Sequence, residues 1–166
     1  MTQRYLIASA LLLGIAPSAF AQGGPTPASV CALLSKAEVE KELGREIFQK
    51  GDGMSLGKNG AVCDFDGDEA QVMVFADPGA EASWEGMLKS FGQDKNKRTP
   101  VPGLGSSAYV IYPPPRNEYQ ATVSMLVVRS GKNLVVVSTA AAKGKPAESA
   151  LAPTIALTKL VLPRLK

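Results

Sequence analysis

The sequence predicts an α+β fold in which helices pack on a mainly antiparallel β-sheet of about five to six strands. Strand-like runs at residues 61–65 and 71–76, and again at 119–130 and 133–141, are joined by short polar turns, which is typical of antiparallel hairpins. Helix-like patterns stand before, between and after these pairs. The order helix, strands, helix, strands, helix therefore predicts helices packed on an antiparallel sheet.

The first 21 residues have the features of a secretory signal peptide. Arg4 supplies a positive charge, residues 6–16 form a short apolar run, and Ala19 and Ala21 fit a small-x-small site, which predicts cleavage between Ala21 and Gln22. The apolar run is well short of the roughly 20 residues of a membrane span, so we expect no stable membrane insertion after cleavage. The predicted location is the periplasm or the external medium, and retention of the segment as an anchor is the alternative.

Behind the signal we expect a flexible lead at residues 22–30, because glycine and proline there disfavour regular structure, and a single α+β domain at residues 31–166. Of the 18 lysines and arginines, Arg4 leaves with the signal, so that 17 basic residues face 15 acidic ones. A small positive charge without a long basic block argues against nucleic acid as a partner.

The chain has two cysteines, Cys31 and Cys63. In an exported protein we expect them to form a disulfide. Closing a loop of about 32 residues would stabilise the fold by roughly 3.5 kcal/mol through the entropy of the unfolded chain. The alternative is a redox-active pair of thiols, but the spacing is not C-x-x-C and the chain contains no histidine that could lower a thiol pKa.

Residues 36–43 are predicted to form the first helix. Ser35 and Glu38 have the spacing of a capping box at its start, and Gly44 suits the left-handed residue that ends a helix. The apolar residue Val39 then faces the core.

A short strand is expected at residues 45–50, with Ile47 pointing inward, and a glycine-rich loop at residues 51–60. In the strand that follows, Cys63 and Phe65 share one face because side chains alternate along a strand. That face should lie against the first helix if the disulfide forms.

A second helix is predicted at residues 79–93, where Trp84, Met87, Leu88 and Phe91 make an apolar stripe at helical spacing. Behind it we expect a polar loop at 94–98, an extended lead at 99–108, a strand at 108–112 and a proline-rich surface turn at 113–118.

Three consecutive valines at residues 135–137 predict a central strand that is covered on both faces. The last segment, residues 147–165, has helical periodicity. Pro153 is expected either in the first turn of that helix or at a kink, and Pro163 near its end.

Four short patterns resemble a known type of protein: C-x-L-L-S-x-x-E-V at residues 31–39, Leu43-Gly44, C-x-F at residues 63–65 and V-x-G-L-G-x-x-A-Y at residues 101–109. They are similar to small exported bacterial proteins of unknown function, in lipoprotein-like families with the PsbP-like α-β-α sandwich. The resemblance implies a Cys31–Cys63 bridge and an antiparallel sheet between helices, and it implies no catalytic residues. The chain differs from the lipoprotein members because it lacks a cysteine placed for lipidation.

The residue types exclude most catalytic chemistry. The absence of histidine removes the usual general base, Ser-His-Asp triads and histidine metal sites. Asp64, Asp66 and Asp68 have the spacing that opens an EF-hand loop, but Glu69 stands where glycine is required and Phe75 where the last glutamate is required. We therefore interpret these carboxylates as a solvated turn and predict no metal and no cofactor.

Three further patterns are weak. Ser55 and Lys58 match S-x-x-K but lie among glycines rather than on a helix. The charged residues 94–98 could attract an anion, although such a run is typical of a helix C-terminus. Trp84 and its stripe could line a ligand pocket, although core packing explains the stripe equally.

Tyr109, Tyr112 and Tyr119 flank a triple proline, and we interpret them as a candidate recognition rim, with covering of the sheet edge as the alternative. Together these expectations describe a non-enzymatic exported domain that binds an envelope protein or a small ligand in a groove between sheet and helices. The alternatives are an inhibitor or accessory subunit of an envelope enzyme and a hydrolase without histidine.

Overall fold

The computed structural model describes residues 24–49, 53–67, 69–76, 86, 98–114 and 121–165. Its helices are α1 (Pro27–Cys31), α2 (Lys36–Leu43), η2 (Ala147–Ala150), α4 (Leu151–Val161) and η3 (Leu162–Arg164). Its strands are β1 (Met54–Ser55), β2 (Gly60–Phe65), β3 (Ala70–Ala76), β4 (Thr99–Pro100), β5 (Ser107–Ile111), β6 (Val123–Ser130) and β7 (Asn133–Ala140).

The seven strands form one sheet in the order β1-β2-β3-β7-β6-β5-β4, and every neighbouring pair is antiparallel. The predicted α+β class and antiparallel sheet are confirmed. The predicted count of five to six strands was too low because the two-residue strands β1 and β4 add one strand at each edge. Such short edges carry little sequence signal, and Pro100 in β4 fits an edge position because proline donates no ladder hydrogen bond.

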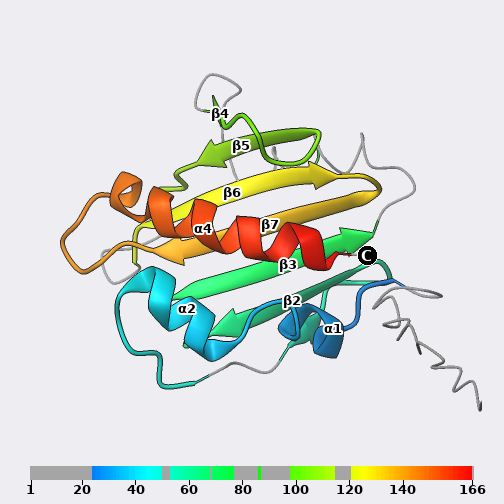
Figure 1. Cartoon of the computed structure of the whole chain (residues 1–166), viewed down its shortest axis with the longest axis horizontal. Helices are drawn as coiled ribbons and strands as arrows, with labels where there is room; N and C mark the ends of the chain where they lie inside the picture. Colours follow the sequence, from blue (N-terminus) through cyan, green and yellow to red (C-terminus); the bar gives the residue numbers. More distant parts are fainter. Residues whose placement is uncertain are drawn as a thin grey trace, which may run out of the picture.

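All the named helices lie on one face of the sheet (Figure 1). Side chains alternate along the strands, so each strand feeds both faces. On the helix side, Phe65, Val72, Val128 and Val137 pack with the helices in the larger hydrophobic cluster.

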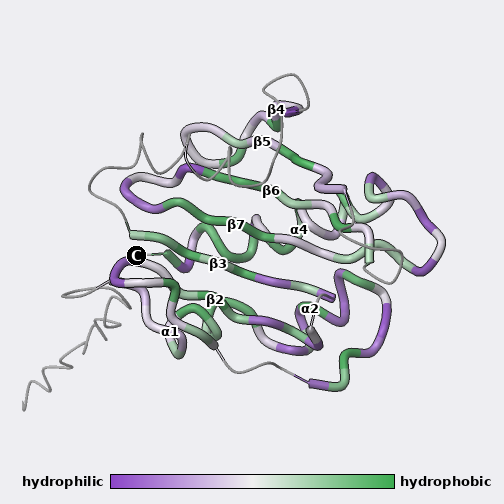
Figure 2. Tube along the Cα trace, turned by 180° about the vertical axis from the view of Figure 1, so that it is seen from behind, coloured by the Kyte–Doolittle hydropathy of each residue, from purple (hydrophilic) through white to green (hydrophobic). Residues whose placement is uncertain are grey.

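The opposite face carries a second apolar cluster. We call it the far-face cluster, and it consists of Ile111, Met125, Val127, Leu134 and Val136, with Met73, Phe75 and Tyr109 packed against it. Figure 2, seen from behind, shows hydrophobic residues running along β3, β6 and β7. The strand with three consecutive valines, β7, pairs with β3 and β6 and has valines in both clusters. The prediction of a central, doubly covered strand is confirmed.

The helix predicted at residues 36–43 is α2, and it has the predicted limits. Ser35 Oγ accepts a hydrogen bond from Glu38 N at 3.3 Å, and Ser35 N donates to Glu38 Oε2 at 2.8 Å, which completes the capping box. Gly44 ends α2 in the left-handed conformation, with φ 66°. The helix is therefore specified by its own sequence at both ends.

The expected flexible lead is wrong for its last residues. Residues 27–30 belong to α1, because Thr26 and Ser29 form a capping box and Pro27 occupies the first turn, where its missing N–H costs nothing. Pro27 therefore begins a helix instead of disfavouring regular structure.

The strand predicted at residues 45–50 is not present in residues 45–49. Ile47 does point inward and is fully buried, but its N–H donates to Glu40 Oε1 at 3.1 Å instead of joining the sheet. The expected loop at residues 51–60 was wrong in two places, since it contains β1 and the first residue of β2.

The C-terminal half follows the predicted pattern with shifted limits. The strand predicted at 119–130 begins at Val123 among the described residues, and Gly131, with φ 58°, turns the chain into β7. Pro153 lies in the first turn of α4, and Pro163 lies in η3, where the helix ends. The second helix predicted at residues 79–93 lies outside the described residues except for Gly86, which is helical.

Buried hydroxyl groups fix α4 on the sheet. Thr139 Oγ1 of β7 and Thr154 Oγ1 of α4 lie 2.6 Å apart, and Thr154 Oγ1 also donates to Ala150 O at 2.6 Å. Both threonines are fully buried. A buried hydroxyl without a partner is costly, so these bonds favour one seating of the helix over others.

An ion pair joins α2 to the end of the chain. Arg164 Nη2 donates to Glu38 Oε1 at 2.5 Å, Arg164 Nη1 donates to Glu38 Oε2 at 3.0 Å, and the same Nη1 donates to Leu33 O at 2.6 Å. This bidentate geometry, together with the Ser35 backbone hydrogen bond, lowers the pKa of Glu38 from 4.5 to about 2. This ion pair thus links α2 to η3.

We predict that Glu38→Gln destabilises the protein in a pH-dependent way. A lowered folded-state pKa adds stability above the unfolded pKa of 4.5, and this is lost as pH falls toward about 2. Glutamine keeps an acceptor for Ser35 N and removes the charge. The free energy of unfolding at pH 7 should fall by about 1 kcal/mol, a value reduced for solvent screening of a partly exposed pair.

The measurement is urea unfolding of both proteins from pH 7 to pH 2. The two curves should converge between pH 4.5 and about 2. Glu42→Gln removes one charge from the same helix and is the matched control, expected to show no such convergence. A deficit in Glu38→Gln that stays constant with pH would contradict the role of the ion pair.

Candidate functional site

The predicted disulfide is present. Cys31, the last residue of α1, is bonded to Cys63 in β2, with Cα atoms 5.0 Å apart and a sequence separation of 32. Cys63 and Phe65 lie in the same cluster as Val39 of α2, as the alternation along the strand predicted. Both cysteine sulfur atoms are part of this disulfide, so the alternative of two free redox thiols is wrong.

The predicted signal, with its cleavage site at Ala21 and Gln22, lies outside the described residues. No helix in the part of the chain that the structure describes is long and apolar enough to cross a membrane.

Tyr109 and Tyr112 of the candidate rim do not share one surface. Tyr109 packs against the far-face cluster, whereas Tyr112 packs against the helix-side cluster. Burial, and then the charge of Glu148, raises the pKa of Tyr112. Tyr119 lies outside the described residues.

The carboxylates of the turn after β2 have structural contacts. Asp66 Oδ2 accepts a hydrogen bond from Phe48 N at 3.2 Å, and Glu69 forms an ion pair with Arg45. Asp64 is half-buried on β2, and Asp68 lies outside the described residues. Among the residues that the structure describes, no group of three His, Cys, Asp or Glu side chains is placed to hold a metal ion.

The other sequence patterns do not gather into a site. Ser55 is exposed on β1 and Lys58 lies in the loop after it, so the S-x-x-K pair has no helix under it. Trp84, its apolar stripe and residues 94–97 lie outside the described residues.

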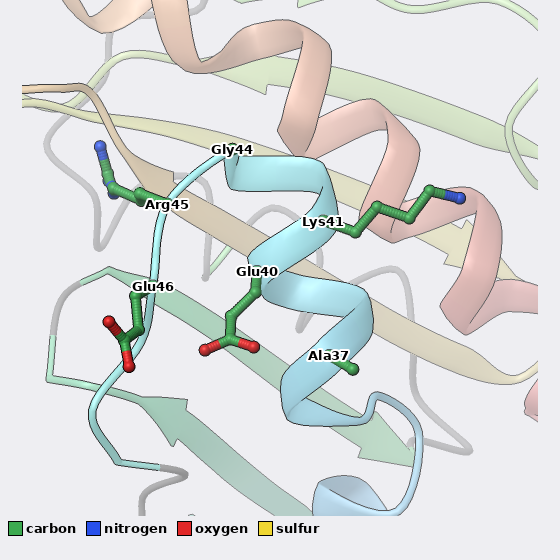
Figure 3. Close-up of a pocket in the computed structure, with 6 residues that line it drawn as sticks. All are labelled: Ala37, Glu40, Lys41, Gly44, Arg45 and Glu46. Carbon is green, nitrogen blue, oxygen red and sulfur yellow. The ribbon is translucent and has the colours of Figure 1, made fainter.

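The described surface has a broad, open hollow at the C-terminal end of α2, with a volume of about 570 Å³. It is lined by Ala37, Glu40, Lys41, Gly44, Arg45 and Glu46. Figure 3 shows the carboxylates of Glu40 and Glu46 on one side, with Lys41 and Arg45 pointing away from them. Glu40 is already engaged, because it accepts from Ile47 N and lies 3.5 Å from Lys36 Nζ.

A second hollow adjoins it where α2, β7 and α4 meet, and we call it the junction hollow. Its volume is about 340 Å³. It is lined by Leu43, Arg45, Ala140, Ala141, Ala142, Lys145, Ser149, Ala150 and Pro153. Most of the side chains that line it are small and apolar, and its polar side chains are two cations and one hydroxyl. A concave apolar surface with a few convergent polar groups is typical of a ligand site.

Arg45 is held in place at the border of both hollows. Its Nη2 donates to Ala140 O at 2.9 Å and also contacts the carboxylate of Glu69. Its Nε is buried and makes no hydrogen bond with the described residues. The guanidinium is therefore fixed by two partners while part of its donor capacity is unused.

Lys145 approaches the junction hollow from the loop between β7 and η2. Its N–H donates to Ala142 O at 2.9 Å, and its carbonyl accepts from Thr122 Oγ1 at 3.1 Å. Gly144, with φ 76°, allows the tight turn just before it. The backbone that carries the ammonium group is thus fixed on both sides.

A third, mostly apolar hollow of about 380 Å³ lies at the β4–β5 edge, and we call it the edge hollow. It is lined by Pro100, Val101, Pro102, Ser107, Ala108 and Tyr109. Tyr109 of the candidate rim lines this hollow from β5.

Sequence reasoning missed Arg45 and Lys145. One follows a helix stop and the other lies in an exposed loop, and 100 positions separate them. Each position alone indicates only a solvated charge. They come together because β7 ends beside α2, which is a property of the folded sheet.

No family model and no curated protein matches this chain.

Proposed function

We propose that the protein is a non-enzymatic, exported binding domain of the bacterial envelope that holds a small ligand in the junction hollow. The observation that carries this proposal is the hollow itself, which has a volume of about 340 Å³ and is lined mainly by small apolar side chains and by two cations. Its size falls within the roughly 300–1,000 Å³ of known ligand pockets, at the small end.

The non-enzymatic character is supported by the residues that carry acid–base and nucleophilic chemistry. The sequence has no histidine, and both cysteines are bonded to each other. Neither the usual general base nor a thiolate nucleophile is therefore available.

Export is supported by the signal-like first 21 residues and by the disulfide. A disulfide that persists in a bacterial protein is typical of an oxidising compartment. The proposed location is thus the periplasm or the medium, with cleavage before Gln22.

A second candidate function is an inhibitor or accessory subunit of an envelope enzyme. The edge hollow favours it, because its lining of prolines, Val101 and Tyr109 suits an apolar side chain of a protein partner. This function would use the β4–β5 edge and leave the junction hollow unoccupied.

The resemblance to the PsbP-like α-β-α sandwich requires a second helical layer. We propose that the predicted helix at residues 79–93 supplies this layer by packing Trp84, Met87, Leu88 and Phe91 on the far-face cluster. The support is that the described helices lie on the other face, while Val127 and Val136 of the far-face cluster are fully buried.

The ligand function is tested with two substitutions of neighbouring, exposed residues. Ala142→Trp fills the junction hollow, whereas Lys143→Trp places the same side chain beside it without lining it. The protein is produced with its own N-terminus, recovered from the periplasm, incubated with a small-molecule extract of the envelope and measured by native mass spectrometry.

The mature wild-type protein should begin at Gln22 and carry an adduct of small mass. Ala142→Trp should lose this adduct and Lys143→Trp should retain it. A wild-type protein without an adduct, or an adduct that survives in Ala142→Trp, would contradict the proposed site.

The sandwich proposal is tested by the single tryptophan of the chain, Trp84. Its fluorescence should be blue-shifted and shielded from acrylamide, because the indole would be buried against the sheet. Val127→Ala should increase quenching. Val128→Ala, one residue further on the same strand and facing the helix side, should not. Full quenching in the wild type, or equal effects of the two variants, would refute this packing.

A further inference from the structure

The charged residues that line the junction hollow are both cations. Among the described residues, Arg45 and Lys145 supply the charge of its lining, and no carboxylate lines it. Glu69 forms an ion pair with Arg45. These three residues together therefore carry one net positive charge.

We propose that the ligand of the junction hollow is a small monocarboxylate with a short apolar body, and this inference rests on the proposed binding function. The carboxylate is held between the guanidinium of Arg45 and the ammonium of Lys145. The apolar body contacts the side chains of Leu43, Ala141 and Pro153.

The guanidinium of Arg45 is positioned for this role before a ligand arrives, and the Lys145 side chain extends from a fixed backbone. Arg45 is fixed by Ala140 O and Glu69, and the backbone of Lys145 is fixed by Ala142 and Thr122. Binding then requires little ordering of Arg45 and of the Lys145 backbone, and reduced ordering raises affinity. A guanidinium also matches the two oxygens of a carboxylate.

The side chains that line the hollow offer few hydrogen-bond partners to strongly hydroxylated ligands such as sugars. The residues around the hollow other than the cations and Ser149 have apolar side chains, and Ser149 Oγ already donates to Pro146 O at 2.7 Å. Hydroxyl groups packed against these apolar side chains would lose hydrogen bonds to water, and the side chains would not replace them. Short aliphatic or aromatic acids have no such loss.

The net charge selects a monoanion over a phosphate dianion. Glu69 compensates one of the two cations, which leaves one positive charge to balance the ligand. A second negative charge on the ligand would have no positive partner and would be repelled by the carboxylate of Glu69. The volume of about 340 Å³ also limits the apolar body to a short chain or a single ring.

The experiment is an NMR titration of the ¹⁵N-labelled mature protein with sodium hexanoate. Hexanamide is the uncharged isostere, and sodium phosphate is the dianionic comparison. Lys145→Gln removes one of the proposed contacts. Lys143→Gln removes the same charge from the same loop at a residue that does not line the hollow.

Hexanoate should shift the amides of residues 140–150, and the shifts should saturate. Lys145→Gln should weaken hexanoate binding by about tenfold, which corresponds to one lost charged contact of about 1.4 kcal/mol. Lys143→Gln should change the affinity by less than about twofold, or roughly 0.4 kcal/mol. Hexanamide and phosphate should bind more weakly than hexanoate.

Equal binding of hexanoate and hexanamide would overturn the monocarboxylate assignment while leaving a ligand-binding hollow in place. Stronger binding of phosphate would overturn it as well. An adduct that Ala142→Trp loses, combined with no hexanoate shifts, would show that the hollow binds a different class of ligand. Equal losses in Lys145→Gln and Lys143→Gln would assign the effect to general charge rather than to the site.

Discussion

The disulfide between Cys31 and Cys63 is the constraint on which the helical layer depends. It ties the end of α1 to the middle of β2, and α2 lies inside the loop that it closes. The stabilisation expected for a loop of this length, roughly 3.5 kcal/mol, is a large share of a typical domain stability of about 5–15 kcal/mol. A helix of eight residues is too short to persist in water by itself, so its position depends on such external ties.

The candidate site inherits its geometry from this constraint. The disulfide holds α1, which comes just before α2, and the pair of Glu38 and Arg164 holds the first turn of α2. The other end of α2 lies near the end of β7. There Arg45 donates to Ala140 O and closes one side of the junction hollow. The threonine contacts that seat α4 fix the opposite wall at Ala150. A ligand in this place would thus contact three elements whose positions are set independently of it.

Local signals in the sequence predicted the fold well. The limits of α2 follow from Ser35, Glu38 and Gly44, which act within a few residues of one another. The two hairpins follow from alternation and turn residues. The α1 helix was missed because Pro27 was given more weight than the Thr26–Ser29 cap.

The site was not predictable in the same way. Arg45 and Lys145 line one hollow only because the end of α2 lies near the end of β7, and no local pattern encodes that arrangement. For Tyr109 and Tyr112 the case is reversed, because their closeness in sequence predicted a shared surface that the fold does not provide. Tyr109 and Tyr112 are close in sequence, but their spacing of three residues places them on opposite faces of the sheet.

The central claim, that the disulfide holds the α2 layer on the sheet, is tested most directly by native-state hydrogen exchange. The comparison is between the wild type and Cys31→Ser/Cys63→Ser. The amides of Val39 and Gly44 donate to Ser35 O and Glu40 O, and their opening free energy should be lower in the variant than in the wild type. The opening free energy of the amides of Val135–Val137 in β7 should fall by less. If the α2 and β7 amides keep the same opening free energy in both proteins, the disulfide does not hold this layer.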